Sequence, residues 1–471
     1  MSSPSAKLKE LSTLPAYRIR ELIRQKKVSP VEVTDFFLKR ISKLNPELNA
    51  LLYVNADNAK AYAAKREAMA QKGDFSKSLL GIPLVVSDVL NMKGIPTTFG
   101  SVLLKDNIVD EDHYEISLLK DAGAIILGKT NMAEFRLSFT TENRLTGPCR
   151  HPDFPKYSPG GGSAGGGVAV EGGLAPLAIS IDMGGSLRVN SSCCGLIGLT
   201  PTRGRVPNVR SHLLPFSEKM FYRKGIIARD VRDVAMVLDV LAQPDARDPL
   251  CCKTKSEQFE ESVQSKQKEM KVAWCPKFHF LELDPEVSEV TTKAAKMLET
   301  LGHHVEEYQP KLSRDFVQHF LNIIGVDRYL LIMNLLNRKD QEPSILMDYS
   351  QEFLLHGDQI TGGQYSLAVT YSDWMENAVN SLFETYDLLV LPTMTDLPYP
   401  VDEISLHECT LHDKDFRKIY GHTCLFNMSG HPALTIPCGR SKTGLPIGLQ
   451  LVGPHFSEGR LLSVANDLLA Q

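Results

Sequence analysis

The sequence predicts an α/β fold in which a largely parallel sheet is covered by helices. Three observations predict it. A capped amphipathic helix begins near residue 29, helix-like and short apolar segments alternate between residues 81 and 127, and another apolar segment lies far along the chain at residues 387–392. This alternation is typical of parallel strands joined by helices that pack on the sheet. We therefore expect the sheet to take strands from both ends of the chain.

The first clear helix is predicted from its N-terminus. Ser29 can cap the helix, Pro30 suits the first helical position, and Glu32 completes a capping box. The apolar residues that follow recur at every third or fourth position and form a stripe that faces a core: Val33, Phe37, Ile41 and Leu44. Asn45 and Pro46 predict the end of this helix.

Two buried strands are predicted after this helix. The first covers residues 84–86, directly after Gly81-Ile82-Pro83. The second covers residues 124–127 and follows a helix that stops at Gly123. Both segments are short and apolar, as buried strands are.

Charge and composition exclude several classes of function. The 471 residues carry 52 Lys and Arg against 56 Asp and Glu, for a net charge of −4, and the basic residues form no run or helix face of the kind that binds nucleic acid. No stretch approaches 18 apolar residues, so no membrane span is predicted. The nine cysteines lack zinc-like spacing, which predicts reduced thiols, no metal site and a cytoplasmic protein. We expect no cofactor, and a small molecule as the ligand.

Glycine is concentrated at residues 158–173 (SPGGGSAGGGVAVEGG). Such a density of glycine allows positive φ angles and close approach of the backbone to another group. A phosphate-binding loop is one interpretation, but the segment contains no GxxxxGK[ST] pattern and follows no clear strand of a dinucleotide-binding unit. The sequence therefore favours a role other than phosphate binding.

A second cluster, Asp182-Met183-Gly184-Gly185-Ser186-Leu187-Arg188, follows it. A serine preceded by two glycines can present its hydroxyl where successive backbone N–H groups converge. Fixed N–H donors of this kind form an oxyanion hole, which stabilises the negative charge that develops in acyl transfer.

These two clusters resemble the amidase-signature family. The family pattern is a glycine- and serine-rich loop, then D-x-G-G-S-[IL]-R, then C-G and K-P-T-x-G-R, and residues 159–206 match it without a gap. The flanking segments agree as well: Gly81-Ile82-Pro83, residues 94–98, 128–135, 426–439 and 444–453. The resemblance covers nearly the whole chain.

The resemblance implies one amidase-signature domain over residues 1–471, with a large mixed, mostly parallel sheet sandwiched between helical layers. The signature core would span about residues 75–230 and the closing strands about residues 385–455. Between them, a helix-rich region is expected at about residues 255–380, and the polar residues 244–271 predict a surface connection.

The family's catalytic groups can be carried over by position. Ser186 matches the nucleophile, and its oxyanion donors would be the backbone N–H groups of Met183, Gly184, Gly185 and Ser186 itself. In the family a second serine bridges the nucleophile to a buried lysine that acts as the base. Here Gly162 stands at the bridging serine, the neighbouring Ser163 matches an accessory serine, and Ser87 stands at the lysine.

No residue is a clear substitute for the missing base. Lys93 is expected to be solvated and Lys129 belongs to the GKTN segment, while His151 and His431 could titrate near neutrality but are more often structural. Loss of a general base lowers the rate by about 10²–10⁴. Ordinary amide hydrolysis is therefore predicted to be slow.

Three functions remain open from the sequence. The first is an enzyme that acts on a small amide or acyl substrate through Ser186, with Asn190 and Arg188 as candidate substrate contacts. The second is an inactive amidase-fold binding or scaffold protein, and the third is an amidotransferase-type subunit. In the first, a substrate group would fill a polar recess between Ser87, Gly162, Ser163 and Ser186. A monomer and a homodimer are both compatible with the sequence.

Overall fold

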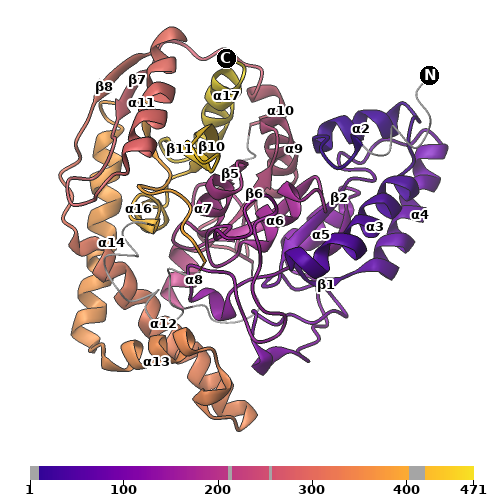
Figure 1. Ribbon diagram of the computed structural model, residues 1–471, viewed down its shortest axis with the longest axis horizontal. Helices are drawn as coiled ribbons and strands as arrows, with labels where there is room; N and C mark the ends of the chain where they lie inside the picture. The colour runs from indigo at the N-terminus through magenta and orange to yellow at the C-terminus, as the bar shows by residue number, and fades with distance from the viewer. Residues whose placement is uncertain (1–9, 210–214, 254–256, 402–418) are drawn as a thin grey trace.

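The computed structural model describes residues 10–209, 215–253, 257–401 and 419–471. An 11-stranded sheet runs through it in the order β1-β3-β2-β4-β6-β5-β10-β11-β9-β7-β8, with helices on both faces (Figure 1). The strands are β1 (Leu51–Val54), β2 (Pro83–Ser87), β3 (Ile125–Thr130), β4 (Leu177–Asp182), β5 (Ile197–Thr200), β6 (Arg223–Ala228), β7 (Lys271–Trp274), β8 (His304–Glu307), β9 (Leu388–Pro392), β10 (Ala433–Arg440) and β11 (Pro446–Val452). The sheet confirms the predicted α/β class.

The helices vary in length and in what they cover. Their bounds are α2 (Ala16–Arg24), α3 (Pro30–Leu48), α4 (Ala56–Gln71), α5 (Tyr114–Asp121), α6 (Gly165–Glu171), α7 (Ser186–Cys193), α8 (Phe216–Met220), α9 (Val231–Leu241), α10 (Phe259–Ser262), α11 (Pro285–Thr300), α12 (Asp315–Lys339), α13 (Asp348–Gln359), α14 (Gly362–Leu382), α16 (Cys424–Ser429) and α17 (Glu458–Leu469), with 3₁₀ turns η1 (Val102–Leu104), η2 (Glu134–Arg136) and η3 (Pro343–Ile345). The long helices α12–α14 project from one side of the sheet (Figure 1).

Strand pairing is mixed, as predicted, but it is not mostly parallel. The pairs β3–β2, β2–β4, β9–β7 and β7–β8 are parallel, whereas the other neighbouring pairs are antiparallel. Antiparallel pairs form the centre of the sheet, from β4 to β9, and one further antiparallel pair, β1–β3, lies at its edge. The apolar segments from which we predicted parallel pairing form β2, β3 and β9. These strands lie outside the antiparallel centre or at its border.

Helix α3 confirms the predicted start and corrects the predicted end. The Ser29 hydroxyl accepts a hydrogen bond from the backbone N–H of Glu32, and the Glu32 carboxylate accepts one from the backbone N–H of Ser29. The capping box is therefore present. The helix continues through Pro46 to Leu48 and stops at Asn49, which adopts the left-handed conformation. A proline so near the end removes only one helical hydrogen bond, which explains why the helix does not stop there.

The other local predictions hold with small shifts. Strand β2 contains the predicted residues 84–86, β3 begins one residue into the predicted second strand, and Gly123 has a φ of 99° after α5. Strand β9 matches the predicted late strand. The polar connection at residues 244–271 is not entirely on the surface, because the short helix α10 within it buries Phe259.

The buried apolar residues form two clusters. One holds most of the sheet and the helices α3, α9, α11 and α17. The other lies between the sheet and helices α12, α13 and α14, and includes Phe139, Met183, Phe320 and Tyr420. This second cluster surrounds the C-terminal end of β4, where the signature segment turns into α7.

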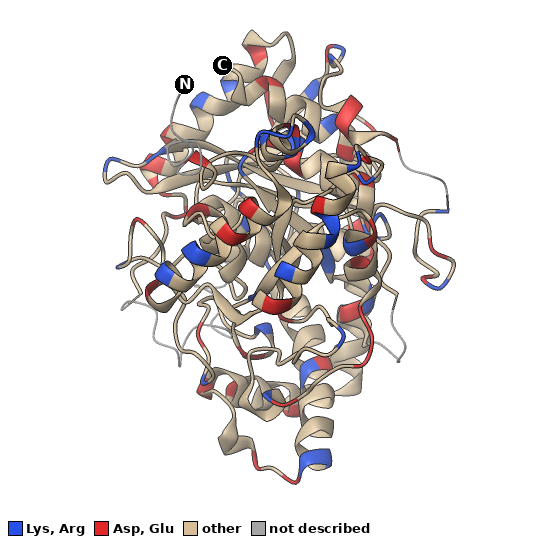
Figure 2. Ribbon diagram, turned by 90° about the vertical axis from the view of Figure 1, so that its right-hand side faces the viewer, with Lys and Arg blue, Asp and Glu red and all other residues tan. Residues whose placement is uncertain are grey.

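Charged residues of both signs are interspersed along the ribbon (Figure 2). None of the helices in the described residues combines the length and apolar character needed to cross a bilayer.

Lys129 occupies a buried structural site rather than the solvent. Its ammonium group contacts Asp88 Oδ1 at 3.0 Å, Pro96 O at 2.8 Å and Thr97 Oγ1 at 2.8 Å. Asp88 in turn accepts hydrogen bonds from the loop N–H groups of Thr98 and Gly100. The ion pair therefore fixes the loop that follows β2 against β3.

We expect Lys129→Met to lower the free energy of unfolding by about 3–5 kcal/mol, because it leaves the buried Asp88 carboxylate without its cation. The control is Lys93→Met, which removes an exposed lysine from the same region. Urea denaturation followed by circular dichroism measures both. Equal stability of the two variants would contradict this structural role for Lys129.

Candidate active site

Ser186 lies at the N-terminus of α7, one tight turn after β4. Gly185, its predecessor, has a φ of 126°, and a Cβ atom there would stand 1.9 Å from Thr423 Oγ1. Only glycine fits such a position. The turn therefore directs the Ser186 side chain to the end of the sheet, where it lines a pocket.

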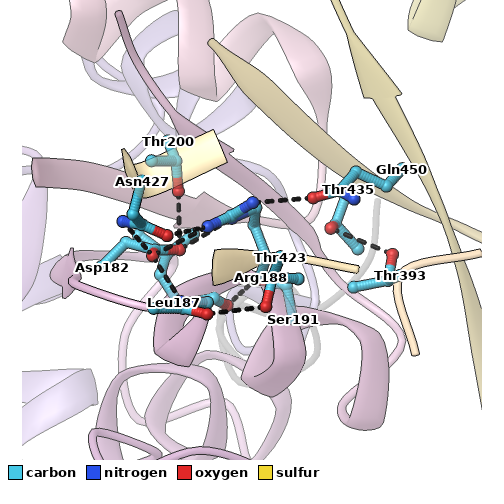
Figure 3. A network of polar contacts seen from close by, with 12 residues as sticks. Asp182, Leu187, Arg188, Ser191, Thr200, Thr393, Thr423, Asn427, Thr435 and Gln450 are labelled. Atoms are coloured by element: carbon cyan, nitrogen blue, oxygen red, sulfur yellow. Dashed lines mark hydrogen bonds and ion pairs between the residues drawn. The ribbon is translucent and has the colours of Figure 1, made fainter. Parts of the chain in front are cut away.

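A buried ion pair holds this turn. Arg188 donates two hydrogen bonds to the Asp182 carboxylate, Nε to Oδ2 at 2.9 Å and Nη2 to Oδ1 at 3.0 Å (Figure 3). Asp182 also accepts from Thr200 Oγ1 on β5 and from Asn427 Nδ2 on α16, and Arg188 donates to Gln450 on β11. The pair thus joins the signature turn to three distant elements.

Electrostatics keep Asp182 ionised. Burial by itself would raise the pKa of Asp182, but the Arg188 guanidinium and the hydrogen bonds from Thr200 and Asn427 outweigh it, so the pKa lies below its ordinary value. The carboxylate also accepts a hydrogen bond of 2.7 Å from the N–H of Gly185. That N–H is engaged, which leaves the N–H groups of Met183, Gly184 and Ser186 as the candidate oxyanion donors.

The pocket above Ser186 is narrow, with a cavity volume of about 60 Å³, below the roughly 300–1,000 Å³ of typical small-molecule sites. Its lining is mainly apolar, with two arginines and a few hydroxyls: Arg136, Leu137, Ser138, Phe139, Gly162, Ser163, Ile181, Met183, Gly184, Ser186, Phe320, Leu321, Ile324, Arg328, Phe353 and Tyr420. Lysine, histidine, aspartate and glutamate are absent from this set of described residues. The pocket thus offers hydroxyls and cations but no conventional base.

The glycine loop packs directly on Ser186. Gly161 has a φ of 77°, and a Cβ atom there would lie 2.9 Å from Ser186 Oγ. At Gly162, a Cβ atom would lie 2.4 Å from the carbonyl oxygen of Ser138. The backbone itself therefore leaves no room for a side chain at position 162, where the resemblance predicted a bridging serine.

Tyr420 is a site residue that sequence reasoning missed. Its hydroxyl accepts a hydrogen bond from the N–H of Gly162 at 3.3 Å, and its ring packs against Phe139. Burial raises its pKa, and the nearby Ser186 hydroxyl lowers it by a smaller amount. A phenol with a raised pKa stays neutral near pH 7. No local motif marks Tyr420, because only the fold brings it to the glycine loop.

The buried serine hydroxyls without a hydrogen-bond partner among the described residues include those of Ser87, Ser163 and Ser186. Ser163 and Ser186 line the pocket together with Gly162, but Ser87, at the end of β2, does not. The structure thus brings three of the four residues of the predicted recess to one pocket. Lys129 is held by Asp88 and does not line it.

Arg188 and Asn190, the candidate substrate contacts, are fully buried and do not line the pocket. Arg188 belongs to the ion-pair network described above. Asn190 donates to Pro159 O at 2.7 Å and accepts from Gly167 N at 2.8 Å. Both side chains are therefore placed to hold the glycine loop and α7 together.

The two candidate histidines also lie outside the pocket lining. His151 Nε2 contacts Cys193 O at 3.0 Å, and His431 Nδ1 contacts Ser429 Oγ at 3.0 Å. Burial lowers the pKa of both rings. Within the described residues, no group of three or more His, Cys, Asp or Glu side chains is arranged to share a metal ion.

The chain is similar to several known proteins. A sequence profile described as Amidase matches residues 32–462. An acylamidase from Rhodococcus erythropolis is 30% identical over 463 residues, which cover 98% of this chain and 96% of the relative. A glutamyl-tRNA(Gln) amidotransferase subunit from Halothermothrix orenii is 31% identical over 483 residues, covering 98% and 97%.

Solved structures show the same likeness. The structure of 6-aminohexanoate cyclic dimer hydrolase complexed with substrate superposes with a TM-score of 0.90 at 28% identity, over 98% of this chain and 97% of that one. A bacterial aryl acylamidase of the amidase-signature enzymes superposes with a TM-score of 0.87 at 25% identity, over 97% and 96%.

We expect Asp182→Asn to lower the free energy of unfolding by about 3–5 kcal/mol, because it leaves Arg188 buried without a counter-charge. The depressed pKa of Asp182 stabilises the wild type above the ordinary aspartate pKa of about 3.9, and this contribution is lost as the pH falls through the lower folded-state value. Chemical denaturation between pH 3 and pH 7, with the exposed Asp121→Asn as control, tests this. A stability difference that does not shrink in acid would contradict it.

We expect Gly162→Ala to lower stability by about 1–3 kcal/mol, because the new Cβ atom overlaps the Ser138 carbonyl and the loop must shift. Gly363→Ala is the control, since its Cβ atom would meet only Thr361 Oγ1 at 3.9 Å. Thermal denaturation compares them. A Gly162→Ala variant as stable as the control would show that the loop has room for a side chain.

Proposed function

The chain belongs to the amidase family, and from this premise we propose that it acts on a small amide or acyl substrate through Ser186 and the backbone N–H groups beside it. The observation that carries the proposal is the placement of Ser186. Its side chain lines an apolar pocket at the N-terminus of α7, next to the N–H groups of Met183 and Gly184.

The reaction would begin with attack of Ser186 Oγ on the substrate carbonyl. The carbonyl oxygen becomes negatively charged as the bond forms, and the N–H groups of Met183, Gly184 and Ser186 can donate hydrogen bonds to it. The Asp182–Arg188 pair fixes the turn that carries these donors, so they need no rearrangement during the reaction. Removal of one such donor typically lowers the rate by about 10²–10³.

Proton transfer is expected to be the slow step of the proposed mechanism. Ser87 and Gly162 stand where the resemblance expects the lysine base and the bridging serine, and the pocket lining offers no other base. Tyr420 stays protonated because its pKa is raised. The Ser186 proton would therefore pass to the leaving group of the substrate, so that substrates with a basic leaving amine react fastest.

A second candidate is an amidase-fold protein that binds its ligand without turnover. The crowded backbone at Gly162 favours it, since the bridging position is filled by the Ser138 carbonyl. An amidotransferase-type subunit is the third, and the likeness to such subunits supports it only as far as the shared fold. We place all three in the cytoplasm as part of the same proposal, with the free thiols of the described cysteines as support.

A fluorophosphonate probe tests the nucleophile. We expect slow labelling that peptide mapping assigns to Ser186 and that Ser186→Ala abolishes, with the exposed Ser366→Ala as control. Because no base assists, turnover of simple anilides is expected to lie about 10²–10⁴ below a typical value of ~10 s⁻¹.

The outcomes separate the candidates. Labelling at Ser186 with low turnover supports the proposed enzyme. Turnover near 10 s⁻¹ would mean that an efficient base is present after all. No labelling, together with ligand binding that Ser186→Ala leaves unchanged, would favour the binding protein.

A further inference from the structure

Thr423 is a buried threonine whose hydroxyl does not cap its own helix. It stands directly before α16, at the N-cap position, where a threonine side chain normally accepts a hydrogen bond from a backbone N–H of the first helical turn. Among the described residues, its side chain accepts no such bond. The hydroxyl instead contacts a segment 239 residues away along the chain, the turn between β4 and α7.

The contact in this turn is a backbone carbonyl. Thr423 Oγ1 lies 2.7 Å from Gly184 O and 3.1 Å from Tyr420 O, so its single hydrogen has two acceptors and the shorter contact is to the turn. Thr423 is fully buried and is not among the described residues that line the pocket. The hydrogen bond therefore turns the Gly184 carbonyl away from the pocket.

The same peptide group is also held at its N–H. A peptide group is planar and trans, so the carbonyl of Gly184 and the N–H of Gly185 point in opposite directions. Thr423 donates to the carbonyl, and Asp182 Oδ1 accepts from the N–H at 2.7 Å. Two buried side chains from different elements therefore fix the orientation of this one peptide group.

This peptide group lies between two of the candidate oxyanion donors. The N–H of Gly184 belongs to the peptide group before it, and the N–H of Ser186 belongs to the one after it. The torsions of Gly184 and Gly185 are not restricted by a Cβ atom, so rotation of the peptide group between them is easy. A rotated group would direct the partial negative charge of the Gly184 oxygen toward the pocket. The hydrogen bond from Thr423 opposes that rotation.

We propose that Thr423 is a positioning residue for the oxyanion hole: its hydroxyl holds the Gly184–Gly185 peptide group so that the N–H groups on either side face the substrate oxygen. The inference rests on the proposed function for the reaction, but not for the hold on the turn. Thr423 acts through the backbone and not by touching the substrate. Misplacement of a group at a reacting centre by about 1 Å can lower the rate about 10²-fold, which makes such a hold matter for the reaction.

The experiment compares Thr423→Val, which replaces the hydroxyl by a methyl group of similar size, with Thr423→Ser, which keeps the hydroxyl. The rate of fluorophosphonate labelling is measured on the full-length chain at increasing probe concentration, so that binding and reaction are separated. Thr423→Val is expected to lower the maximal labelling rate by about 10- to 100-fold and to change the half-saturating concentration by less than about twofold, because oxyanion donors stabilise the reacting state. Thr423→Ser is expected to label within about threefold of the wild-type rate, because its hydroxyl can still donate.

Thr435→Val is the matched control. It removes another fully buried threonine hydroxyl, which lies 3.1 Å from Thr393 Oγ1 and has no contact with the turn. Both labelling parameters are expected to stay at their wild-type values in this variant.

Hydrogen exchange followed by mass spectrometry needs no reaction. In a peptide that spans residues 182–188, Thr423→Val is expected to exchange about five- to tenfold faster than the wild type, because the turn opens more often without the hydrogen bond. Thr423→Ser is expected to exchange at the wild-type rate. Thr423→Ala is a second variant, in case Thr423→Val does not fold, and it is expected to behave in the same way as Thr423→Val.

Labelling of the folded Val or Ala variant at the wild-type rate would overturn the proposal and leave the proposed function intact. So would a loss that Thr423→Ser shares, or a change confined to the half-saturating concentration. If the wild type is not labelled, exchange decides: faster exchange in the variants would reject the proposed reaction and keep the hold on the turn, whereas equal exchange would reject both.

Discussion

The site depends on one buried ion pair, between Asp182 at the end of β4 and Arg188 in the first turns of α7. A charge pair inside a protein is stable only when its remaining donors and acceptors are also satisfied. Here they are satisfied by Thr200, Asn427 and Gln450, which belong to three other elements. The pair therefore sets the turn at Gly185, the direction of Ser186 and the orientation of the remaining N–H donors. It also engages one donor, the N–H of Gly185, which the oxyanion hole consequently lacks.

The turn that carries Ser186 has backbone N–H groups that can stabilise negative charge. Arg136 and Arg328 also line the pocket. The described residues that line the pocket include no Lys, His, Asp or Glu side chain. In the proposed mechanism, an arrangement of this kind suits substrates that carry a basic leaving group. In the proposed mechanism, the described residues of the chain thus stabilise negative charge, whereas the transfer of the proton depends on the substrate.

Sequence reasoning succeeded where short-range chemistry decides the structure. The capping box at Ser29, the strands β2, β3 and β9, and the position of Ser186 after two glycines all follow from local rules. Sequence reasoning failed where the structure depends on contacts between segments that lie far apart along the chain. The antiparallel centre of the sheet depends on which strands become neighbours. The contacts of Arg328 depend on how α12 packs, and those of Tyr420 depend on how the chain just before α16 packs. Arg188 and Asn190 were candidate substrate contacts, but their side chains lie in the interior, which for Asn190 agrees with a structural role.

The packing at Gly162 has a consequence for the evolution of this protein. A serine at that position would place its Cβ atom 2.4 Å from the Ser138 carbonyl, so the loop would have to move first. A lysine at position 87 would enter a fully buried environment, where a cation without an acid partner destabilises the fold. Either substitution alone would thus lower the stability of the fold. A proton relay would form only when both substitutions are present. A serine–lysine relay could therefore arise in this site only through coupled substitutions and not through one substitution at a time.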